Sequence, residues 1–157
     1  MTSNPLAVEV LKEMTNKNFV DLLIFQRACP ESIEWCREHG GTPEELFYAC
    51  EHGEWLGWFI GNNLELLGYS YKEWASGLAN AIEETLTPMD VSKKELVKLL
   101  REYADGKISY GACQAMAYSY GLTERLNFPR GHSYEPSIDS LRRDFPIFEK
   151  EVENEIH

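Results

Sequence analysis

The sequence predicts an all-α protein, a single-domain helical bundle of about seven to nine helices over residues 1–157. Helix-opening residues and glycines that end helices alternate along the whole chain. The apolar residues between them recur at spacings of three and four, whereas almost no stretch alternates apolar and polar residues as a strand does. A chain of 157 residues has the usual length of one domain and can bury its own core.

The first half of the chain carries three helix-start signals. Asn4-Pro5 places a capping residue before a proline at the first helical position, and the apolar stretch 19–28 follows. Cys29-Pro30 opens a helix that stops at Gly40-Gly41, and residues 42–45, Thr-Pro-Glu-Glu, form a capping box for the next one. We expect Gly53 to end or bend that helix before the apolar run that follows.

The second half repeats these signals. Residues 70–73, Ser-Tyr-Lys-Glu, cap a helix that runs toward Thr87-Pro88, and an amphipathic segment from residue 90 stops at Gly106. Ser109 precedes another helix, rich in small residues. Residues 127–137 form the one stretch with loop composition, and residues 137–157 are expected to form one or two helices around Pro146.

The charge limits the classes of partner. Fifteen basic and twenty-six acidic residues give a formal net charge of −11, which opposes nonspecific binding to nucleic acid or anionic lipid but allows a basic protein partner. The N-terminus carries charges where a signal peptide has its apolar core, and no apolar run reaches the roughly 20 residues of a membrane span. We therefore expect a cytoplasmic protein with no contact to nucleic acid or membrane.

The cysteines and histidines of residues 29–52 raise the question of a metal site. Cys50 and His52 are two positions apart on an expected helix, so their side chains should point to nearly opposite sides. Cys29 and Cys36, with an isoleucine between them at helical spacing, instead have the pattern of the buried apolar face of a helix. We expect core cysteines, no metal and no cofactor. The alternative is a small metal-binding protein or enzyme that uses residues 29–52, with Cys36, His39, Cys50 and His52 as ligands.

The aromatic residues of the same region are predicted to form the centre of the core. On helical spacing, Trp55, Trp58 and Phe59 share one face, and Trp35 and Phe47 can meet them from neighbouring helices. A second interpretation is a partly open groove, in which a tryptophan edge and His52 face a ligand or a partner.

The pattern Cys29-Pro30, Trp35, Thr42, Cys50, an acidic residue, Trp55 and Trp58 resembles a motif of small helical proteins from bacteriophages and bacteria. The closing Leu-Arg-Arg-Asp-Phe-Pro segment, residues 141–146, is similar to one near the end of such proteins. These proteins are mostly uncharacterised. The resemblance implies a helical fold and a mobile-element setting, and it supplies no catalytic residue.

No enzyme motif is present: no nucleophile motif surrounds a cysteine, and no phosphate-binding loop or metal-binding helix motif occurs. The favoured hypothesis is a non-enzymatic interaction protein of phage or mobile-element type that binds, and inhibits, a basic host or defence protein in the manner of an anti-CRISPR. A homo-oligomer assembled through the small residues around Gly111 and Ala115 is a further alternative. The residues expected to contact the basic partner are Glu34, Glu38, Glu44, Glu45, Glu51, Glu54 and Trp55.

Overall fold

The structure, a computed structural model, describes residues 5–85, 91–119 and 135–148. The predicted all-α class is confirmed, because the described residues form ten helices and no strand. The four-residue α6 is a single turn that follows α5 directly, too short for periodicity to predict. The helices are α1 (Pro5–Glu13), α2 (Asn16–Phe25), α3 (Pro30–His39), α4 (Pro43–Ala49), α5 (Gly53–Asn62), α6 (Leu64–Leu67), α7 (Tyr71–Glu83), α8 (Val91–Ala104), α9 (Tyr110–Ser119) and α10 (Ile138–Asp144).

Both predicted capping boxes form. The Thr42 hydroxyl accepts a hydrogen bond from the Glu45 backbone N–H at 3.2 Å, and the Glu45 carboxylate accepts one in return from the Thr42 N–H at 3.2 Å. Ser70 and Glu73 make the same exchange at the start of α7, at 3.0 and 2.8 Å. These bonds satisfy backbone donors that a helix start otherwise leaves unpaired.

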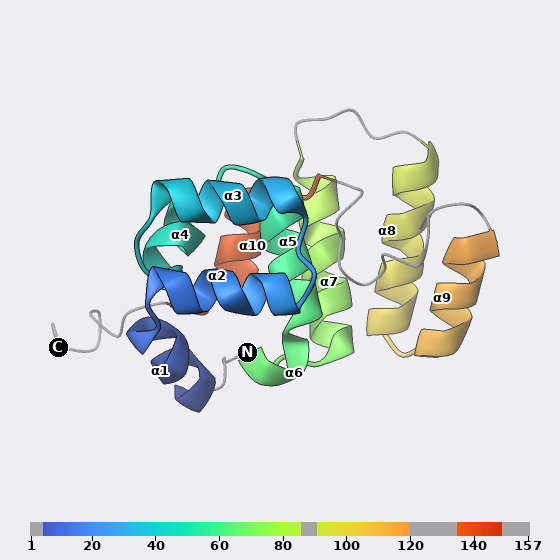
Figure 1. The fold of residues 1–157 in the computed structure, drawn as a ribbon. Helices are drawn as coiled ribbons and strands as arrows, with labels where there is room; N and C mark the ends of the chain where they lie inside the picture. The colour runs from blue at the N-terminus through green and yellow to red at the C-terminus, as the bar shows by residue number, and fades with distance from the viewer. Residues whose placement is uncertain (1–4, 86–90, 120–134, 149–157) are drawn as a thin grey trace, which may run out of the picture.

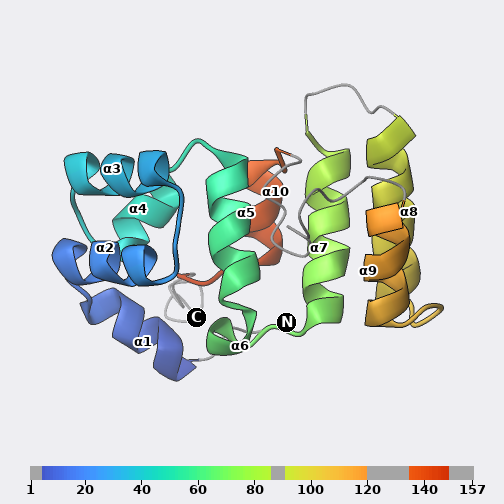
Figure 2. The same cartoon turned by 45° about the vertical axis from the view of Figure 1, so that its right-hand side comes forward.

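The helices follow one another across the molecule (Figures 1 and 2). In Figure 2, α1 to α4 form one end, α5 and α10 lie in the middle, and α7, α8 and α9 continue to the other end. The last helix, α10, packs against both α5 and α7 and so joins elements more than fifty residues earlier in the chain. The helix α9 packs against α8 and lies at the outer edge of the molecule (Figure 1).

The deepest part of the core lies around α7 and the segment after α10. Trp74 is completely buried, and its ring centroid lies 5.2 Å from that of Phe145. Gly77 leaves space for the Phe145 ring, since a Cβ built on this glycine would lie 2.3 Å from its Cζ. Phe148 closes the other side of this segment, with its ring 5.4 Å from that of Phe47. Residues 145–148, which follow α10, are therefore an integral part of the core.

Some sequence predictions fall on residues that the structure does not describe. These are most of the predicted loop at 127–137 and the end of the predicted C-terminal helices, 149–157. Pro146 follows the end of α10, as expected of a residue that cannot continue a helix. None of the described helices has the length and apolar composition that crossing a bilayer requires.

Candidate functional site

An apolar pocket opens between α2, α3, α4 and α5. Its volume is about 60 Å³. Aromatic rings dominate its walls, and three of the four tryptophans of the chain contribute to it. The lining residues are Phe19, Leu23, Ala28, Ser32, Trp35, Cys36, Pro43, Leu46, Phe47, Cys50, Trp55, Leu56, Trp58, Phe59 and Phe148.

Short connections hold the walls of this pocket together. The Asn16 side-chain amide at the start of α2 donates to the carbonyls of Cys36 and Gly41, at 3.1 and 3.0 Å, and so fixes the end of α3 against α2. Gly41 has a φ of +93°, a left-handed conformation that glycine adopts without strain. The turn that it makes brings α4 back beneath α3, so that Phe47 faces the pocket.

Four rings form a continuous row along the outer side of the pocket. The ring centroids of His39 and Trp35 are 5.1 Å apart, those of Trp35 and Trp55 are 6.0 Å apart, and those of Trp55 and His52 are 3.9 Å apart. The two tryptophans are half-buried and the two histidines are exposed. Because these tryptophans both line the pocket and reach solvent, they form its edge.

The predicted aromatic centre is therefore divided. Phe47 and Phe59 are buried, as expected, whereas Trp35, Trp55 and Trp58 are only partly buried. The tryptophan of the sealed core is Trp74, which the sequence analysis did not single out. Its helical spacing to Leu78 and Ile82 was the available signal.

The thiols behave as core groups. Cys36 and Cys50 are buried and line the pocket, and Cys113 is fully buried between α8 and α9. Burial raises the pKa of Cys36 to about 11, with a smaller contribution from the neighbouring Cys50 thiol, and it also raises the pKa of Cys113 to about 11. These thiols are protonated at neutral pH, and the thiolate is the form that attacks electrophiles and binds metals.

The predicted placement of Cys50 and His52 on one helix is wrong, because α4 ends at Ala49 and Cys50 to His52 form the connection to α5. The alternative ligand set is nevertheless divided in the structure, with Cys36 and Cys50 inside the pocket and His39 and His52 exposed outside the tryptophans. Among the described residues, no group of three or more histidine, cysteine or acidic side chains could hold a metal ion.

The six glutamates predicted to bind a partner all lie at the surface of α3, α4, the connection from α4 to α5 and the start of α5, and none is buried. Three have a partner within the chain. Glu34 pairs with Arg37 at 3.1 Å, Glu45 closes the capping box, and Glu54 lies 3.8 Å from the His52 imidazole. The described residues show no ion pair or hydrogen bond for the other three side chains, those of Glu38, Glu44 and Glu51.

The acidic charge is concentrated in this region. Residues 30–54 contain seven glutamates and one arginine, a formal charge of −6, against −11 for all 157 residues. Two of these carboxylates act on the pocket wall at Cys50. Burial is the largest cause of the raised pKa of this thiol, and the charges of Glu54 and Glu51 raise it further, whereas the nearby Arg142 lowers it. We call the exposed surface of these seven glutamates (Glu31, Glu34, Glu38, Glu44, Glu45, Glu51 and Glu54) the acidic face.

Arg142 of α10 has a structural role that the sequence analysis missed. Its guanidinium donates hydrogen bonds to the carbonyls of Phe47, Tyr48 and Cys50, at 3.0, 3.0 and 2.6 Å. These carbonyls lie at the end of α4, where a helix has unpaired acceptors and a partial negative charge. Arg142 therefore ends α4 and joins α10 to the wall of the pocket.

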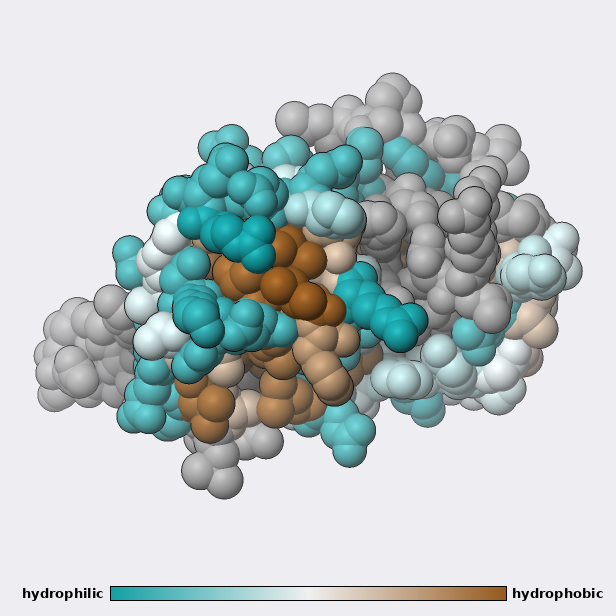
Figure 3. All heavy atoms as spheres, viewed as in Figure 1, coloured by the Kyte–Doolittle hydropathy of each residue, from teal (hydrophilic) through white to brown (hydrophobic). Residues whose placement is uncertain are grey.

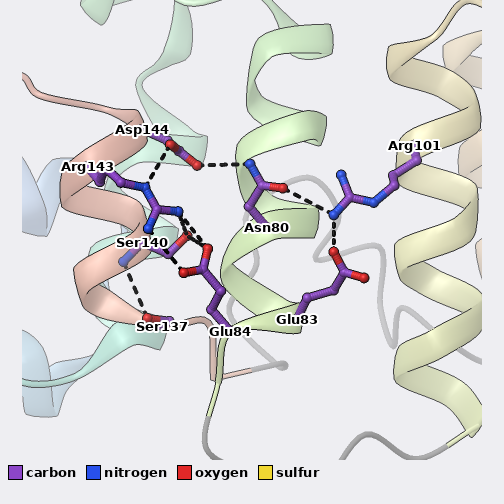
Figure 4. A network of polar contacts seen from close by, with 8 residues as sticks. All are labelled: Asn80, Glu83, Glu84, Arg101, Ser137, Ser140, Arg143 and Asp144. Atoms are coloured by element: carbon purple, nitrogen blue, oxygen red, sulfur yellow. Dashed lines mark hydrogen bonds and ion pairs between the residues drawn. The ribbon is translucent and has the colours of Figure 1, made fainter.

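A second polar cluster joins α7, α8 and α10 (Figure 4). The Arg143 guanidinium donates to both Glu84 carboxylate oxygens, at 3.0 and 2.6 Å, and Ser140 donates to the same carboxylate at 3.1 Å. Asn80 donates to Asp144 and accepts from Arg101, both at 3.1 Å, and Arg101 also pairs with Glu83. These contacts join the end of α7 to α8 and α10, and Arg143 also donates to Ser140 and Asp144 of its own helix, so we interpret the cluster as a structural connection.

Two further surfaces expose apolar residues. On the face shown in Figure 3, apolar residues gather over the end of α2, where Ile24 and Phe25 are 47% and 84% exposed. At the opposite end of the molecule, Gly111 and Ala115 of α9 are exposed.

No protein-family model, curated protein or solved structure matches this chain. The functional assignment therefore depends on the geometry and charge described above.

Proposed function

We propose that this protein acts without catalysis, by binding a basic partner protein through the acidic face, with Trp55 as an apolar anchor. The observation that carries the proposal is the formal charge of −6 within residues 30–54, on glutamates none of which is buried. Rows of carboxylates attract an arginine- and lysine-rich surface over several ångströms and orient it before contact. A half-buried tryptophan beside them contributes apolar area with little loss of side-chain freedom.

The proposal predicts a salt-dependent complex that requires this face. In a pull-down from host lysate, a partner that is retained at low salt should be released as ionic strength rises. The test variant changes Glu34, Glu38, Glu44, Glu45, Glu51 and Glu54 to glutamine, which keeps the Thr42 capping box intact because glutamine also serves in it. This variant should lose the partner.

The matched control removes the same amount of charge elsewhere. It changes six exposed acidic residues outside the acidic face to their amides: Glu9, Glu13, Asp21, Glu65, Asp105 and Asp139. A control variant that keeps the partner while the test variant loses it supports a specific face. Equal loss from both variants would show that net charge alone governs binding and would remove the proposal.

The partner class that this face fits most directly is a protein with a basic nucleic-acid channel, because carboxylates can occupy the positions of phosphates. An anti-CRISPR-like inhibitor from a mobile element is the concrete form of the proposal. A competition assay tests it: the purified protein should displace DNA from a CRISPR nuclease, and the six-glutamine variant should not.

A further inference from the structure

The pocket combines an apolar interior with a negatively charged edge. Its edge is formed by the half-exposed rings of Trp35 and Trp55, whose centroids are 6.0 Å apart. On α3, Glu31 and Glu38 are four residues before and three after Trp35, so they are its neighbours on the helix surface. Beside Trp55, the charges of Glu51 and Glu54 act on the pocket wall at Cys50.

We infer that this pocket binds an amphiphilic organic cation, with an alkyl stem in the apolar interior and the positive charge at the edge, against the tryptophan rings and the glutamates. The class includes the side chains of lysine and arginine. That a partner protein supplies such a side chain rests on the proposed function, whereas the chemistry of the pocket can be tested without any partner.

The size of the pocket favours a single unbranched chain. A cavity needs about 10–15 Å³ to hold one water-sized group, so a volume of 60 Å³ holds about four to six such groups. The lysine stem has four methylene groups. Bulky fused rings would exceed this space.

The position of the charge follows from the surroundings. The interior is lined mainly by apolar and aromatic side chains, which disfavour a charged group, and burial there raises the pKa of the Cys36 thiol. At the edge a cation lies near the tryptophan rings, whose π-systems attract positive charge, and near carboxylates, which attract a cation and repel an anion. The nearby Arg142 does not take this role, since its guanidinium is bound to three carbonyls at the end of α4.

Three probes that share a five-carbon alkyl chain separate charge from apolar contact: pentylammonium, pentanol and hexanoate. Binding is measured from the indole N–H signals in NMR spectra, in which the signals of Trp35, Trp55 and Trp58 should shift and that of the core residue Trp74 should not. Pentylammonium should bind about two- to fivefold more tightly than pentanol, as expected for one exposed cation–π contact, and hexanoate should bind more weakly than pentanol. Equal binding of all three probes, or a shift of Trp74 alone, would contradict the inference.

Two pairs of substitutions test whether the glutamates at the pocket edge cause the preference for the cation. The double change Glu51→Gln and Glu54→Gln should reduce the advantage of pentylammonium over pentanol and leave pentanol binding unchanged. The control pair, Glu9→Gln and Glu65→Gln, removes the same charge from distant exposed positions and should keep the advantage. A partner that binds the acidic face while no probe enters the pocket would refute this inference alone. Probe binding without any basic partner would refute only the proposed function.

Discussion

Gly77 illustrates how a single residue sets the packing of the core. It lies in the middle of α7, where glycine weakens a helix, but a Cβ at this position would be 2.3 Å from the Phe145 ring. Gly77→Ala should therefore destabilise the protein by about 1–3 kcal/mol, the usual cost of overpacking a core. Urea denaturation measures the difference in the free energy of unfolding.

Gly111 of α9 provides the matched control. It is exposed, and a Cβ built there would have no atom within 4 Å. Gly111→Ala should stabilise the protein by up to about 1 kcal/mol, because alanine favours the helix more than glycine does. If Gly77→Ala and Gly111→Ala stabilise the protein equally, this result would contradict the close packing of Gly77 against Phe145.

The buried thiols give a prediction that combines reactivity and pH. Cys113 is fully buried, whereas Cys29 is partly exposed, so iodoacetamide at pH 8 should modify Cys29 first and Cys113 only after unfolding. A mass spectrum showing early modification of Cys113 would contradict its burial.

The pKa of Cys113, raised by burial from 9.0 to about 11, also affects the stability of the fold. The unfolded chain loses this proton first as pH rises, so the free energy of unfolding should fall between pH 9 and 11. Cys113→Ala should make this fall in the free energy of unfolding shallower, because the variant has no thiol to titrate at this position.

At the residue scale, the burial of a side chain could be predicted where apolar residues recur at helical spacing. Cys36 and Phe47 have helical spacing to other apolar residues and are buried as expected. The exposure of Trp35 and Trp55 was not predictable, because the hydrophobic pattern is the same for a sealed core and for a pocket edge. Only the positions of neighbouring helices distinguish the two.

At the scale of the elements, α4 shows a limit of local signals. Its start carries proline and a capping box, and both operate as predicted. Its end carries no glycine or proline before Gly53, so the sequence suggested a helix continuing through Cys50. The helix ends at Ala49, where the carbonyls of Phe47, Tyr48 and Cys50 turn to Arg142, more than ninety residues later in the chain.

This arrangement predicts unequal roles for two adjacent arginines. Arg142→Met should lower the free energy of unfolding by about 2–4 kcal/mol, because it removes charged hydrogen bonds from partly buried carbonyls. Arg143→Met should cost less, since the pair that Arg143 forms with Glu84 is exposed on both sides. Thermal denaturation of both variants compares the two, and equal losses would contradict the proposed end of α4.

At the scale of the whole molecule, the position of α10 could not be read from the sequence. Its own helical pattern and serine cap were visible, but its place between α5 and α7 depends on contacts across more than fifty residues (Figure 2). The same limit applies to the candidate site, whose glutamates and tryptophans were predicted individually. Their assembly around one pocket required the tertiary structure.

The polar cluster that holds α10 on α7 predicts an acid-sensitive fold (Figure 4). Hydrogen bonds from Arg143 hold the pKa of the Glu84 carboxyl below its ordinary value of 4.5, with a smaller contribution from Ser140, whereas partial desolvation acts in the opposite direction. A carboxyl with a lower pKa in the folded state than in the unfolded state stabilises the fold above its unfolded pKa, and this contribution disappears as pH falls through the folded value.

Glu84→Gln should therefore be less stable than the native chain at pH 7, and the difference should shrink once the pH falls below about 4.5, when the native carboxyl also takes up its proton. Urea denaturation at pH 7, 5 and 3 measures this difference. Glu65→Gln, at an exposed position on α6 with no ion pair among the described residues, should match the native chain throughout. A Glu84→Gln deficit that stays constant from pH 7 to pH 3 would mean that the carboxylate charge does not hold α10 in place, because a charge effect must disappear on protonation.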